Sequence, residues 1–258
     1  MAAAVHTELI PVRFSRLKQM ARSPAHYLHS IMQERTDTAA YRLGRAAHSY
    51  ALEGKELTIY DGTRRGKEWD KFRELVGEGN DIYSVKEAES AMAMGNAIRC
   101  SALAMSVLQG TIERTIQWSI GDRQCQGTPD VCGPEYITDL KTTRDAQPEH
   151  FIRQAIRYAY HAQLAWYLDG VRLSGLGKPS KAYIVAVEST PPHPVTVLQL
   201  TPAAIDQGAR LCRLWWEQLM VCEQGGHFPG YSQSIVDFDV LEDDGLSLSF
   251  GGEEVEVT

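Results

Sequence analysis

The stretch GTPDVCGPEYITDLKTT, residues 127–143, places two aspartates and a lysine around one tight turn. Asp130 follows a proline at the end of an extended run, a Gly-Pro turn lies at 133–134, and Asp139 and Lys141 are two residues apart on the returning run. Residues two apart on a strand share a face, so Asp139 and Lys141 point the same way. A hairpin that serves only the fold does not need this set of charges.

The spacing of these charges suits a site for a divalent metal ion. With the turn centred on 133–134, Asp130 pairs near Ile137 and lies diagonal to Asp139, about 7–8 Å away between backbones. Two carboxylates at that spacing can share one hard cation, and Lys141 can stand beside it. Such an ion lowers the pKa of a bound water and offsets charge that grows on a phosphate, which suits phosphodiester hydrolysis. The alternative is a surface Asp–Lys ion pair with Asp130 as a turn cap.

Length and composition indicate a globular protein. The chain has 258 residues, of which 43% are hydrophobic and 9% aromatic, which is enough for a sizeable core. No apolar run reaches the ~18 residues of a membrane span, and the first residues lack the basic-then-apolar order of a secretory signal. We therefore expect a cytoplasmic protein with no membrane association. The five cysteines form no C-x-x-C pair, which favours free thiols over disulfides or a zinc site.

The negative charge is concentrated at the carboxyl end. The net charge is −7, yet eight acids and no Lys or Arg lie in residues 235–258. The rest of the chain carries 25 acids against 26 bases and is nearly neutral, so a local basic surface for nucleic acid remains possible. This contrast predicts a domain over residues 1–234 and an acidic tail over 235–258.

Sequence periodicity predicts helices and strands that alternate in blocks. Helices are expected at 15–33 (two pieces broken at Ser23-Pro24, where Ser23 is a cap), 38–54, 86–110, 153–173 and 202–224. Strands are expected at 111–120, 123–131, 135–142, 181–189 and 195–200, and a charged, partly mobile loop at 62–74. The order α, β-β-β, α, β-β, α predicts one α/β domain with a central mixed β-sheet flanked by helices.

Several motifs together resemble a nuclease family. GTPD followed by DLKTT resembles the G-x-P-D and D-x-K signature of the PD-(D/E)xK nuclease superfamily, whose restriction-endonuclease-like core is a helix, a bent mixed sheet and a second helix. GRAAHSYALEG is similar to the G-x-x-x-H helix of the RecB-like branch, and QLAWY to its Q-x-x-x-Y. FSRLKQMARSPAHYLHS resembles the start of RecE-type phage and prophage exonucleases.

This resemblance implies a role for individual residues of the site. His48 matches a metal-binding histidine, whereas by itself a histidine on an alanine-rich helix face is more often packed in a core. Asp130 and Asp139 match the two metal-binding carboxylates, and the backbone carbonyl of Leu140 lies where the family often adds an oxygen ligand. Lys141 matches the lysine that orients or activates the attacking water and balances phosphate charge.

Three further residues are candidates for the same site. Gln163 and Tyr167 are four apart on one helix face and can reach the site or the DNA together; alternatively, they belong to a helix packed on the sheet. Glu113 could be an additional acid near the metal.

Other charged and aromatic groups have less specific interpretations. Arg153 and Arg157, and the group Arg64, Arg65 and Lys67, could contact phosphates or could simply be solvated charges. The pair Trp215 and Trp216 is expected to fill the core or a subunit interface rather than to stack on bases.

The resemblance implies an activity and partners. The expected function is that of a Mg²⁺-dependent exodeoxyribonuclease, with Mn²⁺ able to substitute, that resects linear double-stranded DNA from its ends, 5′ to 3′, for recombination. A ring-shaped homo-oligomer and a partner single-strand annealing protein are also implied. The alternatives are an endonuclease or a single-strand-specific nuclease with the same site, or a DNA-binding or assembly protein with a vestigial site.

Overall fold

The computed structural model describes residues 10–33, 37–232, 234–236, 247–250 and 253–256. The amino-terminal half is mainly helical and contains β1 (Val12–Arg13), α1 (Phe14–Leu17), η2 (Lys18–Ala21), α2 (Pro24–Met32), α3 (Ala39–His48), η3 (Ser49–Glu53), α4 (Lys67–Val76), α5 (Val85–Cys100) and α6 (Ala102–Val107). The strands and remaining helices follow as β2 (Thr111–Ile112), β3 (Ile116–Ile120), β4 (Arg123–Gly127), β5 (Val131–Cys132), β6 (Tyr136–Thr143), α7 (Pro148–Arg157), α8 (Tyr160–Leu173), β7 (Lys181–Glu188), β8 (Val195–Gln199), α9 (Pro202–Gly225), β9 (Ser247–Phe250) and β10 (Glu253–Glu256).

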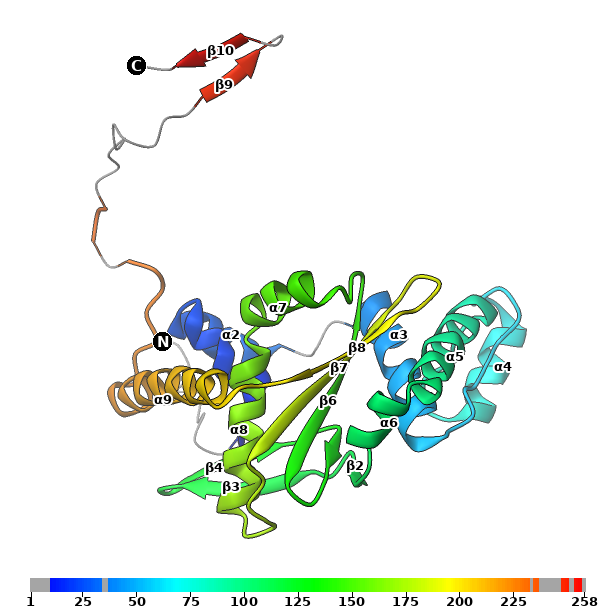
Figure 1. The fold of residues 1–258 in the computed structure, drawn as a ribbon, viewed down its shortest axis with the longest axis horizontal. Helices are drawn as coiled ribbons and strands as arrows, with labels where there is room; N and C mark the ends of the chain where they lie inside the picture. Colours follow the sequence, from blue (N-terminus) through cyan, green and yellow to red (C-terminus); the bar gives the residue numbers. More distant parts are fainter. Residues whose placement is uncertain (1–9, 34–36, 233, 237–246, 251–252, 257–258) are drawn as a thin grey trace.

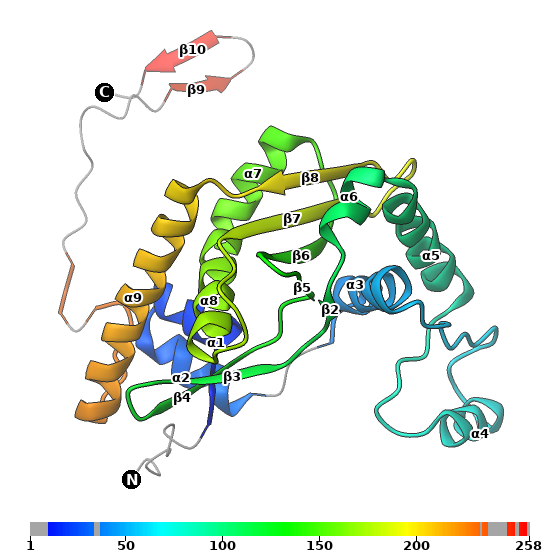
Figure 2. The same cartoon turned by 60° about the horizontal axis from the view of Figure 1, so that its bottom comes forward.

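The central sheet is mixed, as the sequence predicts. It has five strands in the order β2-β5-β6-β7-β8, in which β6 and β7 are parallel and the other pairs are antiparallel. A second sheet, β1-β4-β3, joins the amino-terminal strand in parallel to β4. Figures 1 and 2 show helices on both sides of the strands, with α8 and α9 at one side and α3, α5 and α6 at the other.

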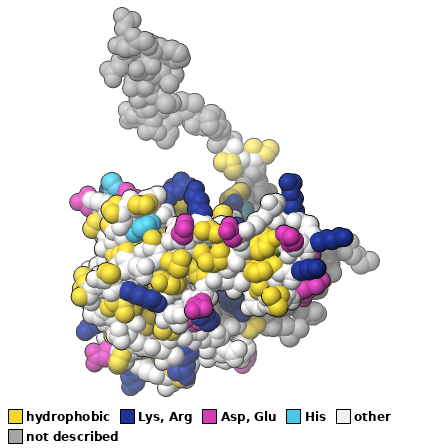
Figure 3. Space-filling view, turned by 90° about the vertical axis from the view of Figure 1, so that its right-hand side faces the viewer, with side chains coloured by type: hydrophobic (Ala, Val, Ile, Leu, Met, Phe, Trp, Pro, Cys, Tyr) yellow, Lys and Arg dark blue, Asp and Glu magenta, His cyan; other side chains and the backbone are white. Residues whose placement is uncertain are grey.

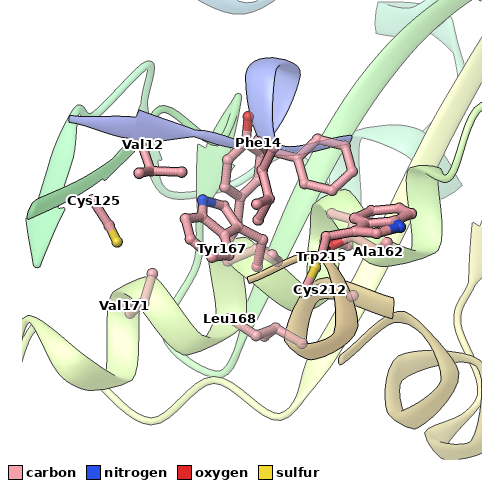
Figure 4. Packing of buried hydrophobic residues seen from close by; sticks show 14 of the residues in the cluster. Val12, Phe14, Cys125, Ala162, Tyr167, Leu168, Val171, Cys212 and Trp215 are labelled. Atoms are coloured by element: carbon pink, nitrogen blue, oxygen red, sulfur yellow. Dashed lines mark hydrogen bonds between the residues drawn. The ribbon is translucent and has the colours of Figure 1, made fainter. Parts of the chain in front are cut away.

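Alternation along the central strands divides the core in two. Ile137 and Ile184 belong to the cluster that packs against α8 and α9, whereas Leu140 and Val185 belong to the cluster beneath α3 and α5. Figure 4 shows how the first cluster is filled: side chains from the amino-terminal segment, β4, α8 and α9 meet around Tyr167. Because successive strand residues face opposite layers, Asp139 and Lys141 lie on the α8 side.

The first predicted break in the helices is confirmed. Helix α2 begins at Pro24, and the Ser23 hydroxyl accepts a hydrogen bond of 3.4 Å from the His26 backbone N–H. Helix α3 continues through the π-helical turn η3 and ends at Gly54, whose φ of 66° is left-handed. A glycine carries no steric penalty in that conformation, which explains the stop.

Other expected boundaries were wrong. The expected loop at 62–74 contains most of α4, whose amphipathic pattern is masked by its many charges. The helix expected at 86–110 is two helices, α5 and α6. The backbone of Ser101 is extended, which ends α5, and its hydroxyl caps the first turn of α6. The single strand expected at 111–120 is β2 and β3 in different sheets, and the helix expected at 153–173 is α7 and α8, with a break at Ala159.

The register of the site hairpin also differs from the expectation. Cys132, rather than Asp130, pairs with Ile137, and Val131 pairs with Thr138. This shift of two residues keeps every side chain on its expected face, because the strand repeat is two residues. Asp130 is thereby brought level with Asp139, where the sequence had predicted a diagonal.

The cysteines and the described part of the tail complete the fold. All five cysteines are free thiols, as expected. In the tail at 235–258, β9 and β10 form a two-stranded antiparallel sheet that the sequence did not predict, and residues 237–246, with five of the eight acids, lie outside the described residues. Among the helices that the structure describes, none has the length and apolar character needed to cross a membrane.

Candidate active site

Three acids from three neighbouring strands lie in a row. Ile112 pairs with Val131, so Glu113 comes level with Asp130, and its backbone N–H donates a 2.9 Å hydrogen bond to the Asp130 carbonyl. The register of β5 with β6 then brings Asp130 level with Asp139. Glu113 has a φ of 50°, which ends β2 at this point and turns the chain away. The row therefore marks the place where the short strands separate from β6.

The edge of β6 beyond Thr138 is open because β5 has only two residues. There the backbone N–H of Leu140 donates a 2.6 Å hydrogen bond to Oδ2 of Asp130, which fixes the orientation of that carboxylate. The N–H and C=O of one strand residue point to the same edge, so the Leu140 carbonyl also faces the Asp130 side.

Helix α3 brings a histidine to the same place. His48 is its last residue, and its Nδ1 lies 3.5 Å from Oδ2 of Asp130. One ligand atom each from His48, Glu113 and Asp130 lie within 4.8 Å of one another, a grouping that could hold a metal ion. The helix packs on β6 through Gly44, where an added Cβ would lie in ordinary contact, 3.5 Å from Oγ1 of Thr142.

The second aspartate is paired with the lysine. Asp139 is buried, and its Oδ2 forms an ion pair with the ammonium of Lys141. Burial raises the pKa of Asp139 to about 6, although Lys141 opposes this shift. Burial disfavours the charge of Lys141, but Asp139 and Asp130 outweigh that effect and raise its pKa. Lys141 thus keeps its proton at neutral pH.

The clustered acids crowd negative charge at the open edge. Desolvation, followed by the nearby Asp130 carboxylate, raises the pKa of Glu113 to about 7, although part of its side chain faces solvent. A cation placed between these carboxylates would offset their mutual repulsion and favour their ionised forms. The donor set of carboxylate oxygens and one imidazole nitrogen fits a divalent ion such as Mg²⁺ or Mn²⁺.

Gln163 and Tyr167 form a unit on α8. Nε2 of Gln163 donates a 3.1 Å hydrogen bond to the Tyr167 hydroxyl. Tyr167 is buried, and burial together with the Asp139 charge raises its pKa to about 12. Its ring needs the glycine of GTPD, since a Cβ at Gly127 would lie 2.8 Å from it. The pair therefore packs on the sheet and also borders the Asp139–Lys141 ion pair.

The remaining candidates separate into anchored and exposed groups. Arg64 donates 2.9 Å hydrogen bonds to the Ile82 carbonyl and to Glu87, so it anchors its loop, whereas Arg153 and Arg157 are exposed on α7. Figure 3 shows the end of the molecule that carries α4 and α5, where basic, acidic and hydrophobic side chains are interspersed. The Trp215 side chain is buried and Trp216 packs against the same core, as expected.

Sequence reasoning placed His48, Asp130, Asp139 and Lys141 near one another, and the structure brings them together. It left open whether Glu113 belongs, and the structure places this residue beside Asp130. Asp139 is not part of the three-residue group, because its carboxylate contacts Lys141 instead. The sequence placed Glu113 only on the first expected strand, and the pairing of β2 with β5 is what brings it to Asp130.

One solved structure shares this fold, and a second solved structure resembles it less closely. One crystal structure from Eubacterium rectale, named "Putative exonuclease", has a TM-score of 0.64 and 14% identity and covers 90% of this chain and 91% of its own. A phage-related exonuclease from Haemophilus somnus 129PT covers 82% of this chain and 96% of its own at 16% identity, with a TM-score of only 0.36. No curated protein sequence matches the chain.

A family model gives the assignment. Residues 13–237 match the model described as a PDDEXK-like domain of unknown function (DUF3799). The match includes His48, Glu113, Asp130, Asp139 and Lys141, and the mixed sheet flanked by helices is the one that this family name implies. The chain belongs to the DUF3799 family of PDDEXK-like domains.

Proposed function

We propose that the protein is a metal-dependent deoxyribonuclease that hydrolyses phosphodiester bonds, and that it acts as an exonuclease on linear double-stranded DNA. The observation that carries this proposal is the convergence of His48, Glu113 and Asp130, with ligand atoms within 4.8 Å of one another. Beside them stands an ion pair between the buried Asp139 and the half-buried Lys141. A site of this composition, within a PDDEXK-like domain, supports nuclease chemistry.

The proposed metal ligands are His48, Asp130, Asp139 and the carbonyl of Leu140, with Glu113 as an additional oxygen donor. Mg²⁺ is the expected ion and Mn²⁺ a substitute, because both accept oxygen ligands and Mn²⁺ accepts imidazole. Asp130 is oriented for this role, since the Leu140 N–H holds one of its oxygens.

A bound divalent ion would supply charge at the phosphate and lower the pKa of a water molecule. Lys141 carries a proton and is held by Asp139, so its proposed part is to orient the water and to balance phosphate charge. The Gln163–Tyr167 pair would support this arrangement from α8.

The finer features of the proposal come from the resemblance to RecE-type exonucleases. They are resection in the 5′-to-3′ direction, a role in recombination, a ring-shaped homo-oligomer and a partner annealing protein. A cytoplasmic location belongs to the same proposal, because the enzyme must meet its DNA.

The test compares end-labelled linear duplex with a covalently closed circle of the same sequence, each with and without Mg²⁺. We expect loss of label from the linear DNA only, and only with Mg²⁺. The control is Asp139→Asn, which keeps the side-chain shape but removes a charge that the ion needs; it should remain folded and inactive.

Each other outcome has a defined meaning. Cleavage of the circle would replace the exonuclease with an endonuclease, and cleavage of single strands alone would indicate a single-strand-specific enzyme. Equal metal-dependent cleavage by Asp139→Asn would overturn the site. DNA binding without cleavage under all conditions would favour a vestigial site.

A further inference from the structure

Tyr160 lies beside Lys141, and two further tyrosines, Tyr158 and Tyr41, lie near Tyr160; the proposed hydrolysis gives none of the three a role. We call Tyr41, Tyr158 and Tyr160 the tyrosine rim. The Tyr160 ring is closest to the chemistry, because Nζ of Lys141 lies 4.9 Å from its centroid. Tyr158 follows, with its ring centroid 5.8 Å from that of Tyr160 and the planes tilted by 38°. The rim therefore begins at the lysine and leads outward.

The third member comes from the other side of the site. Tyr41 lies on α3, seven residues before His48 and so on the same helix face. It contributes to the electrostatic environment of Tyr160, as do Lys141 and Asp139. The helix that supplies the histidine thus also supplies an aromatic side chain to the rim.

A special backbone conformation positions the other two rings. Ala159 has a φ of 57°, in the left-handed region that residues other than glycine seldom adopt. This residue separates α7 from α8, which begins at Tyr160. The break places the rings of Tyr158 and Tyr160 next to each other at the corner between the two helices. In one continuous helix they would point apart, because residues two apart do not face each other in a helix.

The outer rings of the rim are accessible. Tyr158 is 47% exposed and Tyr41 57% exposed, whereas Tyr160 is half-buried and packs against Phe151, 6.3 Å away between ring centroids. Core packing therefore accounts for Tyr160 but not for its two neighbours. The exposed Tyr158 thus presents a flat apolar face one ring away from Lys141, the residue proposed to balance phosphate charge.

The surface of α7 adds positive charge to the same approach. Its exposed residues include two apolar–cationic pairs along the sequence, Ile152 with Arg153 and Ile156 with Arg157. Alternating cationic and apolar side chains match a strand whose backbone is anionic and whose bases are apolar on their faces.

We propose that the tyrosine rim is a binding subsite for an unpaired nucleobase, with Tyr158 as the stacking residue and Tyr160 as its support next to Lys141. This inference rests on the proposed nuclease function and specifies its substrate: the strand that enters the site has at least one unpaired base at its end. A duplex end must then fray, or carry an overhang, before the phosphate reaches Lys141. Stacking on an aromatic side chain tolerates any base, because every base has a π face.

The test measures binding to two single-stranded oligonucleotides of equal length and charge, one of thymidines and one with three abasic nucleotides at each end. Ca²⁺ replaces Mg²⁺ so that the strands stay intact, and fluorescence anisotropy gives both dissociation constants. We expect wild-type protein to prefer the strand with bases by about 5- to 10-fold, the scale of one stacked base.

Variants then assign the preference to the rim. Tyr158→Ala should bring the ratio of the two dissociation constants close to one without weakening the binding of the abasic strand. Tyr158→Phe should keep the wild-type ratio. The matched control is Tyr231→Ala, which removes a tyrosine that is 77% exposed, follows α9 and contacts the His26 ring of α2. It should behave as wild type, and circular dichroism should show every variant folded.

The outcomes separate this inference from the nuclease proposal. Cleavage of linear DNA with equal binding to both strands, or a ratio that Tyr158→Ala leaves unchanged, would overturn the base subsite while the nuclease stands. A Tyr158-dependent ratio in a protein that cleaves no DNA would keep the subsite and reject the nuclease.

Discussion

Asp130 is the residue on which the candidate site depends most at the scale of single side chains. It touches the Leu140 backbone and the His48 ring, and its own backbone binds Glu113. Through these contacts of its carboxylate and its backbone, one residue connects three segments of the chain. Lys141 contacts the second aspartate, on its own strand, and the Tyr160 ring of α8. The two residues should therefore respond differently to substitution.

Lys141→Met tests the separation of binding from chemistry. Methionine keeps the length of the side chain and removes its charge, so we expect the cleavage rate to fall by about 10² to 10⁴-fold while divalent metal still binds. Calorimetric titration with Mn²⁺ measures the second part. A variant that no longer takes up the ion would make Lys141 a structural residue.

His48→Ala should act on metal affinity. The substitution removes the only imidazole of the group, so the concentration of Mg²⁺ needed for half-maximal cleavage should rise, and excess Mn²⁺ should restore part of the rate. Titration of both ions against the initial rate measures this. An unchanged Mg²⁺ requirement would return His48 to the role of a packed helix residue.

At the scale of elements, α8 and α9 pack closely against each other on one side of the central sheet. Gly208 of α9 lies against the backbone of α8: a Cβ there would be 2.4 Å from the His161 carbonyl oxygen. Because α8 carries Tyr160, Gln163 and Tyr167, its position also decides the wall of the site. Close approach of the two helices is thus a requirement of both stability and activity.

Gly208→Ala should lower the free energy of unfolding by about 1–3 kcal/mol, the usual cost of overpacking a well-filled interior. Gly225→Ala, in the same helix, is the control, since a Cβ there meets nothing within 4 Å. It should be neutral or stabilise slightly, because alanine favours a helix over glycine. Urea unfolding compares the two, and equal stabilities would contradict the tight contact.

His161 of the same helix predicts a pH dependence. It is buried, neither ring nitrogen has a hydrogen-bond partner among the described residues, and burial lowers its pKa. The unfolded chain then takes up the proton first as pH falls below the ordinary histidine value near 6.5, so unfolding is favoured with a slope of at most about 1.4 kcal/mol per pH unit.

Urea unfolding at pH 7.5 and 5.5 should show a smaller loss of stability for His161→Leu than for the wild type. Other titrating groups are common to both proteins, so the difference in slope isolates His161. The same loss in both would mean that the ring finds a partner for its proton.

For the whole molecule, the ring-shaped homo-oligomer remains a prediction. Without its acidic tail the chain is nearly neutral, and the face in Figure 3 has mixed charge, so that face offers little continuous basic surface. A ring would bring exposed residues such as Arg153 and Arg157 from several subunits onto one path.

We predict a homo-oligomer by light scattering at assay concentration, and a monomer would reject the ring. Removal of residues from 241 onward tests the tail. If the tail lies away from the DNA path, affinity at low salt should change little; if it screens the path, affinity should rise and depend more on salt. Loss of DNA binding would contradict both arrangements and give the tail a supporting role.

The sequence by itself determined the features that depend on neighbouring residues. The period of two places Asp139 and Lys141 on one face, Ser23 caps α2, and Gly54 stops the helix that carries His48. These follow from local backbone geometry, which a short stretch of chain specifies without help from distant parts.

Only the tertiary structure decided how distant segments meet. The pairing of β2 with β5 brings Glu113 to Asp130, and packing of α3 on β6 brings His48 to the same edge. The left-handed Ala159 brings Tyr158 next to Tyr160, which lies beside Lys141, where periodicity had predicted one helix. Strand register and helix packing depend on the burial of whole apolar faces. The free energy of that burial comes from many residues far apart in the sequence, so no short stretch of sequence specifies it.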